Sequence, residues 1–188
     1  MHKTRFIPAV IPACALVLAL AATCLAGGFT LSSPDVADGG TLSNRYLLNG
    51  FGCTGDNVSP ALAWTNPPAG TKSFALTVYD PDAPTGSGWW HWVVFNIPAD
   101  CRSLAQGAGN AGGALPAGAV QSRTDFGQPG YGGACPPQHD APHRYVFTVY
   151  ALDVAHLDLG PDSPAAMVGF TLHGHTLGKA EITATYGR

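Results

Sequence analysis

Charged residues are scarce in this sequence, and their scarcity excludes one large class of function. Only 11% of the 188 residues are Asp, Glu, Lys or Arg, and the formal net charge is −3. A nucleic-acid-binding domain carries a clustered basic surface, and this sequence has no such cluster, so nucleic acid is not an expected partner. Internal repeats, heptads and long runs of one charge are also missing, which excludes solenoids and coiled coils.

Several motifs of catalytic and metal sites are absent as well. The cysteines show no Cys-x-x-Cys spacing, which argues against a zinc site. No Gly-x-Ser-x-Gly motif occurs, and no motif links a serine to a histidine, so nucleophilic catalysis has little support. His173 and His175 form a candidate ligand pair, but they lie in a predicted helix, where residues i and i+2 do not face each other.

Glycine and proline, in contrast, are abundant. The chain has 24 glycines and 16 prolines with no period, a composition that predicts many turns and short strands. A helix is expected from about Pro164 to His173, with Ser163 as its N-cap, and Glu181–Tyr186 alternates like a final strand. The residues at helical spacing are Ala166, Phe170 and Gly174.

The N-terminus has the layout of a secretory signal peptide. A basic start precedes the apolar run Phe6–Leu25, which small residues close. Cleavage after Ala26 divides the chain into a signal peptide, residues 1–26, and one domain, residues 27–188, which would be periplasmic or secreted. An uncleaved membrane anchor is the alternative, whereas lipid attachment at Cys24 is disfavoured because the residues before it match a lipoprotein signal poorly.

Export changes the expected state of the cysteines. Cys14 and Cys24 leave with the signal peptide, and Cys53, Cys101 and Cys135 remain. An oxidising compartment favours one disulfide and one leftover thiol. Because Cys53 and Cys135 both lie in glycine-rich loops, they are the expected pair, and Cys101 is the odd cysteine.

The clearest strands are separated by a turn that carries polar residues. Ser73–Tyr79 alternates with a period of two, and Asp80 continues its apolar row. The loop Pro81–Gly88, with two prolines and two glycines, predicts a tight turn before the strand Trp89–Ile97. In that second strand His91 is expected on the row of Val93, Phe95 and Ile97. Weaker strands are expected at Leu42–Leu48 and Ala61–Trp64.

A third strand, His143–Leu152, also begins with a histidine. If it runs parallel to the His91 strand within one mostly antiparallel sheet, both imidazoles reach the edge where Asp80 and Asp82 lie. The convergence predicts a small polar pocket. Its expected aromatic walls are Trp89 or Trp90 and Tyr131.

Two other interpretations of these residues stay open. Asp-Pro-Asp is good turn chemistry, so the acids could be turn residues and the histidines packing residues. Two histidines and a carboxylate could also bind a divalent ion, although no pair of them has close helical or hairpin spacing.

Three segments resemble signatures of the phosphatidylethanolamine-binding protein family, in particular its bacterial Raf-kinase-inhibitor-like branch. They are Tyr79–Pro84, Trp89–Val94, and Gly133–Pro137 followed by His143-Arg144-Tyr145. The resemblance extends from about Thr41 to Tyr186. Two departures are that Trp90 stands where many eukaryotic members have a second histidine, and that the chain ends at Arg188 without the C-terminal helix of animal members.

The resemblance implies a mainly β fold, in which a large antiparallel sheet packs with a smaller sheet and helices are few and short. It also implies an anion pocket for phosphate or a phospholipid head group, with a polar floor made by Asp80, His91 and His143. The residues implied to line or brace it are Asp82, Pro84, Trp90, Gly133, Pro136, Pro137 and Tyr145. A Cys53–Cys135 disulfide would suit the exported bacterial members.

The function expected from residues and resemblance together is that of an exported, non-enzymatic binding protein without a cofactor. Its partners would be a phosphate-bearing small ligand or lipid head group and an unidentified protein that it inhibits or modulates, and a homodimer is one option. The alternatives are a phosphoester hydrolase or transferase that uses the histidines and Asp80 as acid–base groups, and a partner-binding factor whose pocket is vestigial.

Overall fold

The computed structural model describes residue 1 and residues 27–188. The predicted signal peptide, residues 1–26, therefore falls outside the described residues except for Met1. Among the residues that are described, none belongs to a helix long and apolar enough to cross a membrane.

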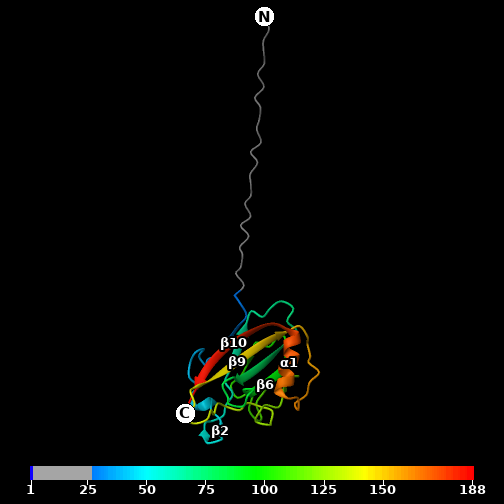
Figure 1. The fold of residues 1–188 in the computed structure, drawn as a ribbon. Coiled ribbons are helices and arrows are strands. Elements are labelled where there is room, and N and C mark those ends of the chain that lie inside the picture. Colours follow the sequence, from blue (N-terminus) through cyan, green and yellow to red (C-terminus); the bar gives the residue numbers. More distant parts are fainter. Residues whose placement is uncertain (2–26) are drawn as a thin grey trace.

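A five-stranded antiparallel sheet forms the centre of the fold, as Figure 1 shows for several of its strands. The order of its strands is β10 (Thr176–Tyr186), β9 (His143–Leu152), β5 (Ser73–Asp80), β6 (Trp89–Pro98) and β8 (Val120–Gln121). Because β6 and β9 are both antiparallel to β5, they run parallel to each other, as the sequence analysis assumed. Both strands therefore begin at the edge of the sheet where β5 ends.

The remaining elements are short and cover this sheet. A smaller sheet contains β1 (Thr30–Ser32), β4 (Leu62–Thr65) and β7 (Ser103–Leu104), and a separate hairpin pairs β2 (Asn49–Gly50) with β3 (Cys53–Thr54). Two helices complete the described part of the chain, the 3-10 helix η1 (Asn44–Tyr46) and α1 (Ala165–His175). The expected mainly β fold, with a large and a smaller antiparallel sheet and few helices, is confirmed.

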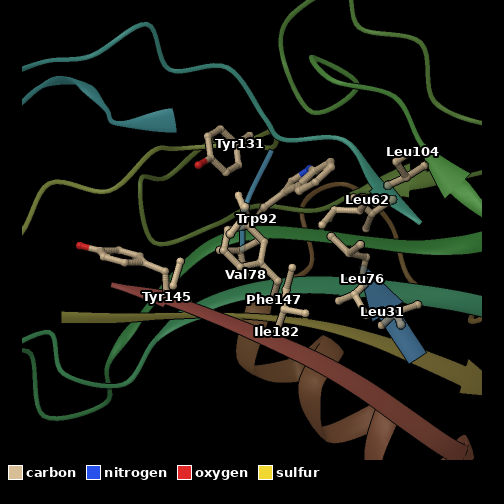
Figure 2. Packing of buried hydrophobic residues seen from close by; sticks show 14 of the residues in the cluster. Leu31, Leu62, Leu76, Val78, Trp92, Leu104, Tyr131, Tyr145, Phe147 and Ile182 are labelled. Carbon is tan, nitrogen blue, oxygen red and sulfur yellow. The ribbon is translucent and has the colours of Figure 1, made fainter. Parts of the chain in front are cut away.

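Each face of the central sheet has its own apolar core. On one face, side chains such as Val78, Phe147 and Ile182 pack against the smaller sheet, as Figure 2 shows. On the other face, Ala75 and Val93 pack against helix α1. With both faces covered, β5 is buried at almost every position, and even its polar residues Ser73 and Thr77 are enclosed.

Strand β6 contains a bulge that the sequence analysis missed. Val78 pairs with Trp92 and Tyr79 pairs with Trp90, so His91 has no partner on β5. The extra residue turns the imidazole onto the face of Trp92, whereas Val93 lies on the opposite face. The expectation that His91 shares a row with Val93 and Phe95 is therefore wrong, because strict alternation ends at the bulge. Ile97 does lie on the face of Trp92, because a second irregularity between Val94 and Ile97 shifts the alternation again.

Three other local expectations need correction. The segment expected as a weak strand, Leu42–Leu48, contains η1 instead. Helix α1 has Pro164 at its N-cap, not Ser163, and its buried residues are Ala165, Val168 and Leu172, which leaves Phe170 exposed. The final strand is longer than expected, because β10 runs antiparallel to β9 along nearly its whole length.

Candidate functional site

A cavity of about 220 Å³ lies at the edge of the central sheet, where β5 ends and where β6 and β9 begin. Each of the three strands contributes an acid or a histidine to its wall, Asp80 from β5, His91 from β6 and His143 from β9. All three side chains are buried in the protein. The strand arrangement thus brings together residues that are up to 63 positions apart in the sequence.

Asp80 is fixed by hydrogen bonds on both of its carboxylate oxygens. Its Oδ1 accepts from the backbone N–H groups of Asp82 and Ala83, at 2.8 and 3.1 Å. Its Oδ2 lies 2.7 Å from Nδ1 of His143. Since a carboxylate can only accept, Nδ1 carries the hydrogen and Nε2 is the atom of His143 left for a ligand. Nε2 also lies 3.5 Å from Asp140 Oδ2.

His91 is oriented in the same way by a backbone carbonyl. Its Nδ1 donates to the carbonyl oxygen of Gly132 at 2.8 Å, so Nε2 is again the unpaired ring atom. The ring packs edge-on against Tyr145 and Phe126, with centroid distances of 5.2 and 5.3 Å. Burial lowers the pKa of His91 because the charged imidazolium is poorly solvated there.

Two buried donors in the cavity wall have no hydrogen-bond partner. They are the hydroxyl of Tyr145 and Nε1 of Trp89. Figure 2 shows the Tyr145 hydroxyl directed away from the aliphatic side chains of the core. Burial raises the pKa of Tyr145, so its hydroxyl keeps its hydrogen at neutral pH. Buried polar groups are nearly always paired, and two unpaired donors beside one cavity therefore point to a ligand that accepts hydrogen bonds.

The rim of the cavity is apolar and includes one half of a disulfide. Phe51, Phe126, Cys135, Pro136 and Pro137 line it. A disulfide joins Cys135 to Cys53, the pair expected from the sequence. Among the cysteines that the structure describes, Cys101 is the one with a free thiol.

The structure brings most of the sequence-derived site residues to this cavity. Asp80, Pro84, His91, Pro136, Pro137, His143 and Tyr145 all line it. Gly133 braces it from behind, because its N–H donates to Oδ1 of Asn57 and its Cα faces the backbone of Leu47 and Leu48.

Asp82 faces away from the cavity and binds Arg144. The Arg144 guanidinium and backbone N–H both donate to its carboxylate, at 2.7 to 2.9 Å. Chiefly through the side-chain hydrogen bond, Arg144 lowers the pKa of Asp82 to about 2. Asp82 therefore holds the turn after β5 onto the start of β9 and does not line the cavity.

The expected aromatic walls are partly wrong. Trp90 lies on the opposite face of the sheet, where it packs on Tyr79 with a centroid distance of 4.5 Å, because the bulge begins after it. Tyr131 is buried outside the cavity and donates to the carbonyl of Tyr46. Trp89 is the tryptophan in the wall, as one of the two options had it.

Sequence reasoning missed two aromatic wall residues. Phe51 and Phe126 come from glycine-rich loops far apart in the chain, and their rings stack at a centroid distance of 6.1 Å. Nothing in the local sequence of either loop indicates that they meet. The one available signal for Phe51 was its place two residues before Cys53, a cysteine of the expected disulfide.

The donor set fits an anion better than a metal ion. Over the described residues, no group of three or more His, Cys, Asp or Glu side chains is arranged to hold a metal. The cavity instead combines two hydrogen-bond donors with two imidazoles that become donors when they are protonated. Such a site can bind a small oxyanion, and it can also place a carboxylate–imidazole pair next to a bound group.

Comparisons with known proteins agree with this architecture. Residues 32–187 match the family model described as phosphatidylethanolamine-binding protein. The chain is 56% identical over 156 residues to the UPF0098 protein YbhB of Escherichia coli strain K12, which covers 83% of this chain and 98% of YbhB. It is 35% identical over 183 residues to the putative lipoprotein LppC of Mycobacterium tuberculosis strain H37Rv, covering 97% of this chain and 84% of that protein.

A solved structure shows the same fold. The crystal structure of E. coli YbcL, described as a new member of the mammalian PEBP family, superposes with a TM-score of 0.84 at 50% sequence identity, over 85% of this chain and 98% of that one. A putative phosphatidylethanolamine-binding protein homologue from Chlamydia trachomatis superposes with a TM-score of 0.71 at 33% identity, over 85% of this chain and 97% of its own.

Proposed function

The chain belongs to the phosphatidylethanolamine-binding protein family, and from this premise we propose that it is an exported, non-enzymatic binding protein whose cavity takes a phosphate group. The group would belong to a small phosphate-bearing molecule or to a phospholipid head group. The carrying observation is the pair of unpaired buried donors, Tyr145 and Trp89, beside the cavity. A phosphate oxygen would satisfy both.

Protonation of the histidines supports the same ligand. In the neutral form each Nε2 carries a lone pair, because each Nδ1 already donates to Asp80 or to Gly132. A lone pair repels an anion, so tight binding of phosphate requires a proton on at least one Nε2, supplied by the solvent or by the phosphate itself. Binding should therefore weaken as the pH rises, and where the solvent supplies the proton, binding is accompanied by proton uptake.

Two observations support export. The first is the Cys53–Cys135 disulfide, because disulfides persist in oxidising compartments and are rare in the bacterial cytosol. One similar protein is named as a putative lipoprotein. Together with the secretory layout of residues 1–26, they favour the periplasm or the cell exterior.

If this protein modulates a protein partner, that partner would carry the phosphate group that the cavity binds, or would compete for it.

Isothermal titration of the protein with inorganic phosphate and with O-phosphorylethanolamine at pH 6 tests this proposal. We expect saturable binding that His143→Ala removes. His156→Ala is the matched control, because His156 is exposed and lies outside the cavity. The absence of binding at millimolar concentrations of both compounds would refute a phosphate site.

One observation favours an enzyme as the second candidate. A buried carboxylate–imidazole pair such as Asp80–His143 can act as a general base towards a bound water. A phosphoester hydrolase would release phosphate from p-nitrophenyl phosphate or O-phosphorylethanolamine, and His143→Ala would abolish the release. A binding protein would take up these compounds and return them unchanged.

A further inference from the structure

The wall residue Phe51 stands at the tip of a hairpin that is separate from both larger sheets. Strands β2 and β3 pair only with each other, through two residues each. Phe51 and Gly52 form the turn, with φ values of 50° and 81°, the backbone shape of a tight two-residue hairpin turn. Phe51 is 74% exposed and still lines the cavity, so it lies at the cavity mouth.

Three ties hold the tip of this hairpin against the cavity, while its base is held by the hydrogen bond from the N–H of Leu48 to the carbonyl of Ala134. The first tie is the Cys53–Cys135 disulfide, which links the hairpin to the Cys135 loop. The second is Arg188, whose side chain donates to the carbonyls of Phe51, Gly52 and Pro136 at 2.7 to 3.3 Å. The third is the stacking of Phe51 on Phe126. Figure 1 shows β2 and the C-terminus at the same end of the fold.

The disulfide is the strongest of these ties. An isolated two-stranded hairpin is marginally stable in water. The Arg188 hydrogen bonds to Phe51 and Gly52 are exposed, and so is the Phe51 ring in the stack. Phe51 also has a positive φ, which is unfavourable for a bulky residue without external support. The disulfide joins residues 82 positions apart in the sequence, and its opening leaves the tip of the hairpin held to the Cys135 loop by hydrogen bonds and ring stacking alone.

We propose that the Cys53–Cys135 disulfide controls this cavity: its reduction releases the β2–β3 hairpin, withdraws Phe51 from the mouth and lowers the affinity for the phosphate ligand. The affinity part of this inference rests on the proposed function. The release of the hairpin does not.

The reductant is a dithiol. One of its thiolates attacks the sulfur of Cys135, the less buried cysteine of the pair, so that the S–S bond breaks and Cys53 leaves as a thiolate. The second thiol of the reductant then displaces Cys135 from the mixed disulfide. Two electrons pass to the protein, each cysteine sulfur takes one proton, and the dithiol becomes a disulfide.

Ligand and redox state are coupled in both directions. If the oxidised protein binds phosphate more tightly by some factor, phosphate must stabilise the disulfide against reduction by the same factor. A tenfold difference in affinity corresponds to about 30 mV in the reduction potential of this two-electron couple.

The first experiment measures affinity. Titration of the oxidised and the dithiol-reduced protein with inorganic phosphate should show at least about tenfold weaker binding after reduction. Phe51→Asn is the matched variant, because Asn accepts a positive φ while removing the ring. This variant should bind phosphate as weakly as the reduced wild type, and its reduction should not lower the affinity further. If the oxidised and the reduced protein bind phosphate with equal affinity, the disulfide does not control binding.

The second experiment needs no ligand. Chymotrypsin cleaves after exposed aromatic residues in mobile segments, so reduction should accelerate cleavage after Phe51, while hydrogen exchange of helix α1 and strands β5 and β9 stays unchanged. Equal rates of cleavage after Phe51 in the oxidised and the reduced protein would overturn the release of the hairpin. A loss of hydrogen-exchange protection throughout the fold on reduction would overturn it as well. A failure of oxidised protein to bind phosphate would instead refute the proposed function, together with the affinity part of this inference.

Discussion

Asp80 Oδ2 lies 2.7 Å from His143 Nδ1, and this buried contact sets the hydrogen-bonding character of the cavity. Because the carboxylate accepts the Nδ1 hydrogen, His143 presents Nε2 to its surroundings. Gly132 imposes the same tautomer on His91. Two imidazoles held in this way offer acceptors when neutral and donors when charged, so proton binding and anion binding are linked at one site.

The lowered pKa of His91 predicts a component of acid instability. In the unfolded chain the imidazole titrates near its ordinary value of about 6.5, whereas burial keeps it neutral to lower pH in the folded protein. As the pH falls below about 6.5, the unfolded state gains a proton that the folded state does not, so stability falls by up to about 1.4 kcal/mol per pH unit.

His91→Asn tests this component, because an Asn amide can still donate to the Gly132 carbonyl. Urea denaturation between pH 7.5 and 5, in buffers free of phosphate, should show a shallower loss of stability for the variant than for the wild type. The comparison uses the slope of the free energy of unfolding against pH, so a constant loss of stability caused by the smaller Asn side chain does not affect it. Parallel curves would contradict the prediction.

Asp80→Asn should reverse the tautomer of His143. Its Oδ1 can keep the two backbone N–H bonds at Asp82 and Ala83, which places the amide nitrogen opposite Nδ1 of His143. Nδ1 must then accept, and Nε2 carries the hydrogen. Phosphate binding to the variant should therefore take up fewer protons from the buffer than binding to the wild type. The free energy of unfolding should fall by about 1–3 kcal/mol, because the charged hydrogen bond is lost.

Calorimetry of Asp80→Asn in two buffers that differ in ionisation enthalpy counts the protons directly. The ionisation of free phosphate is the same in both titrations, so a difference in the count reports the protonation of the bound complex. A variant that takes up as many protons as the wild type would argue against the role of Asp80 in fixing the tautomer.

Gly133→Ala should destabilise the protein strongly. A Cβ at this position would lie 2.5 Å from the Tyr46 carbonyl oxygen and press on the backbone of Leu47 and Leu48. None of these atoms belongs to a flexible side chain, so we expect a loss of at least about 1–3 kcal/mol. Gly160→Ala is the control, because a Cβ there meets nothing within 4 Å, and it should stay within about 0.5 kcal/mol. Thermal denaturation of both variants measures the difference.

The two adjacent tryptophans should respond differently to ligand. Trp89 lines the cavity with its Nε1 unpaired, whereas Trp90 packs on Tyr79 across the sheet. Phosphate should therefore change the intrinsic fluorescence of Trp90→Phe as it does in the wild type, and Trp89→Phe should lose the change and bind several-fold more weakly. A fluorescence change that is lost in Trp90→Phe and kept in Trp89→Phe would contradict the placement of the bulge.

The central strands could be predicted from the sequence because their apolar periodicity is strong. The strand predicted at Ser73–Tyr79 appears with one further residue, Asp80, and His143–Leu152 appears as predicted, since alternation along a strand follows directly from backbone geometry. The convergence of Asp80 and His143 at one edge followed from the antiparallel order of the strands.

What the sequence could not reveal depends on tertiary contacts. The bulge at His91 adds one residue to a uniformly bulky segment, Trp89–Val94, in which no residue type marks the irregularity. Leu42–Leu48 has the composition of a strand, but it forms η1, and the N–H of Leu48 bonds to Ala134 from a distant loop. Phe51 and Phe126 meet only because the loops around them fold over the cavity.

The bulge has a consequence for how this chain could change over generations. His91 is the one extra residue between the pair Trp90–Tyr79 and the pair Trp92–Val78. Deleting its single codon would close the ladder without shifting the register of any other pair. An in-frame loss of three nucleotides could therefore remove a ligand-facing imidazole and leave the sheet intact, so the capacity to bind can be lost separately from the capacity to fold.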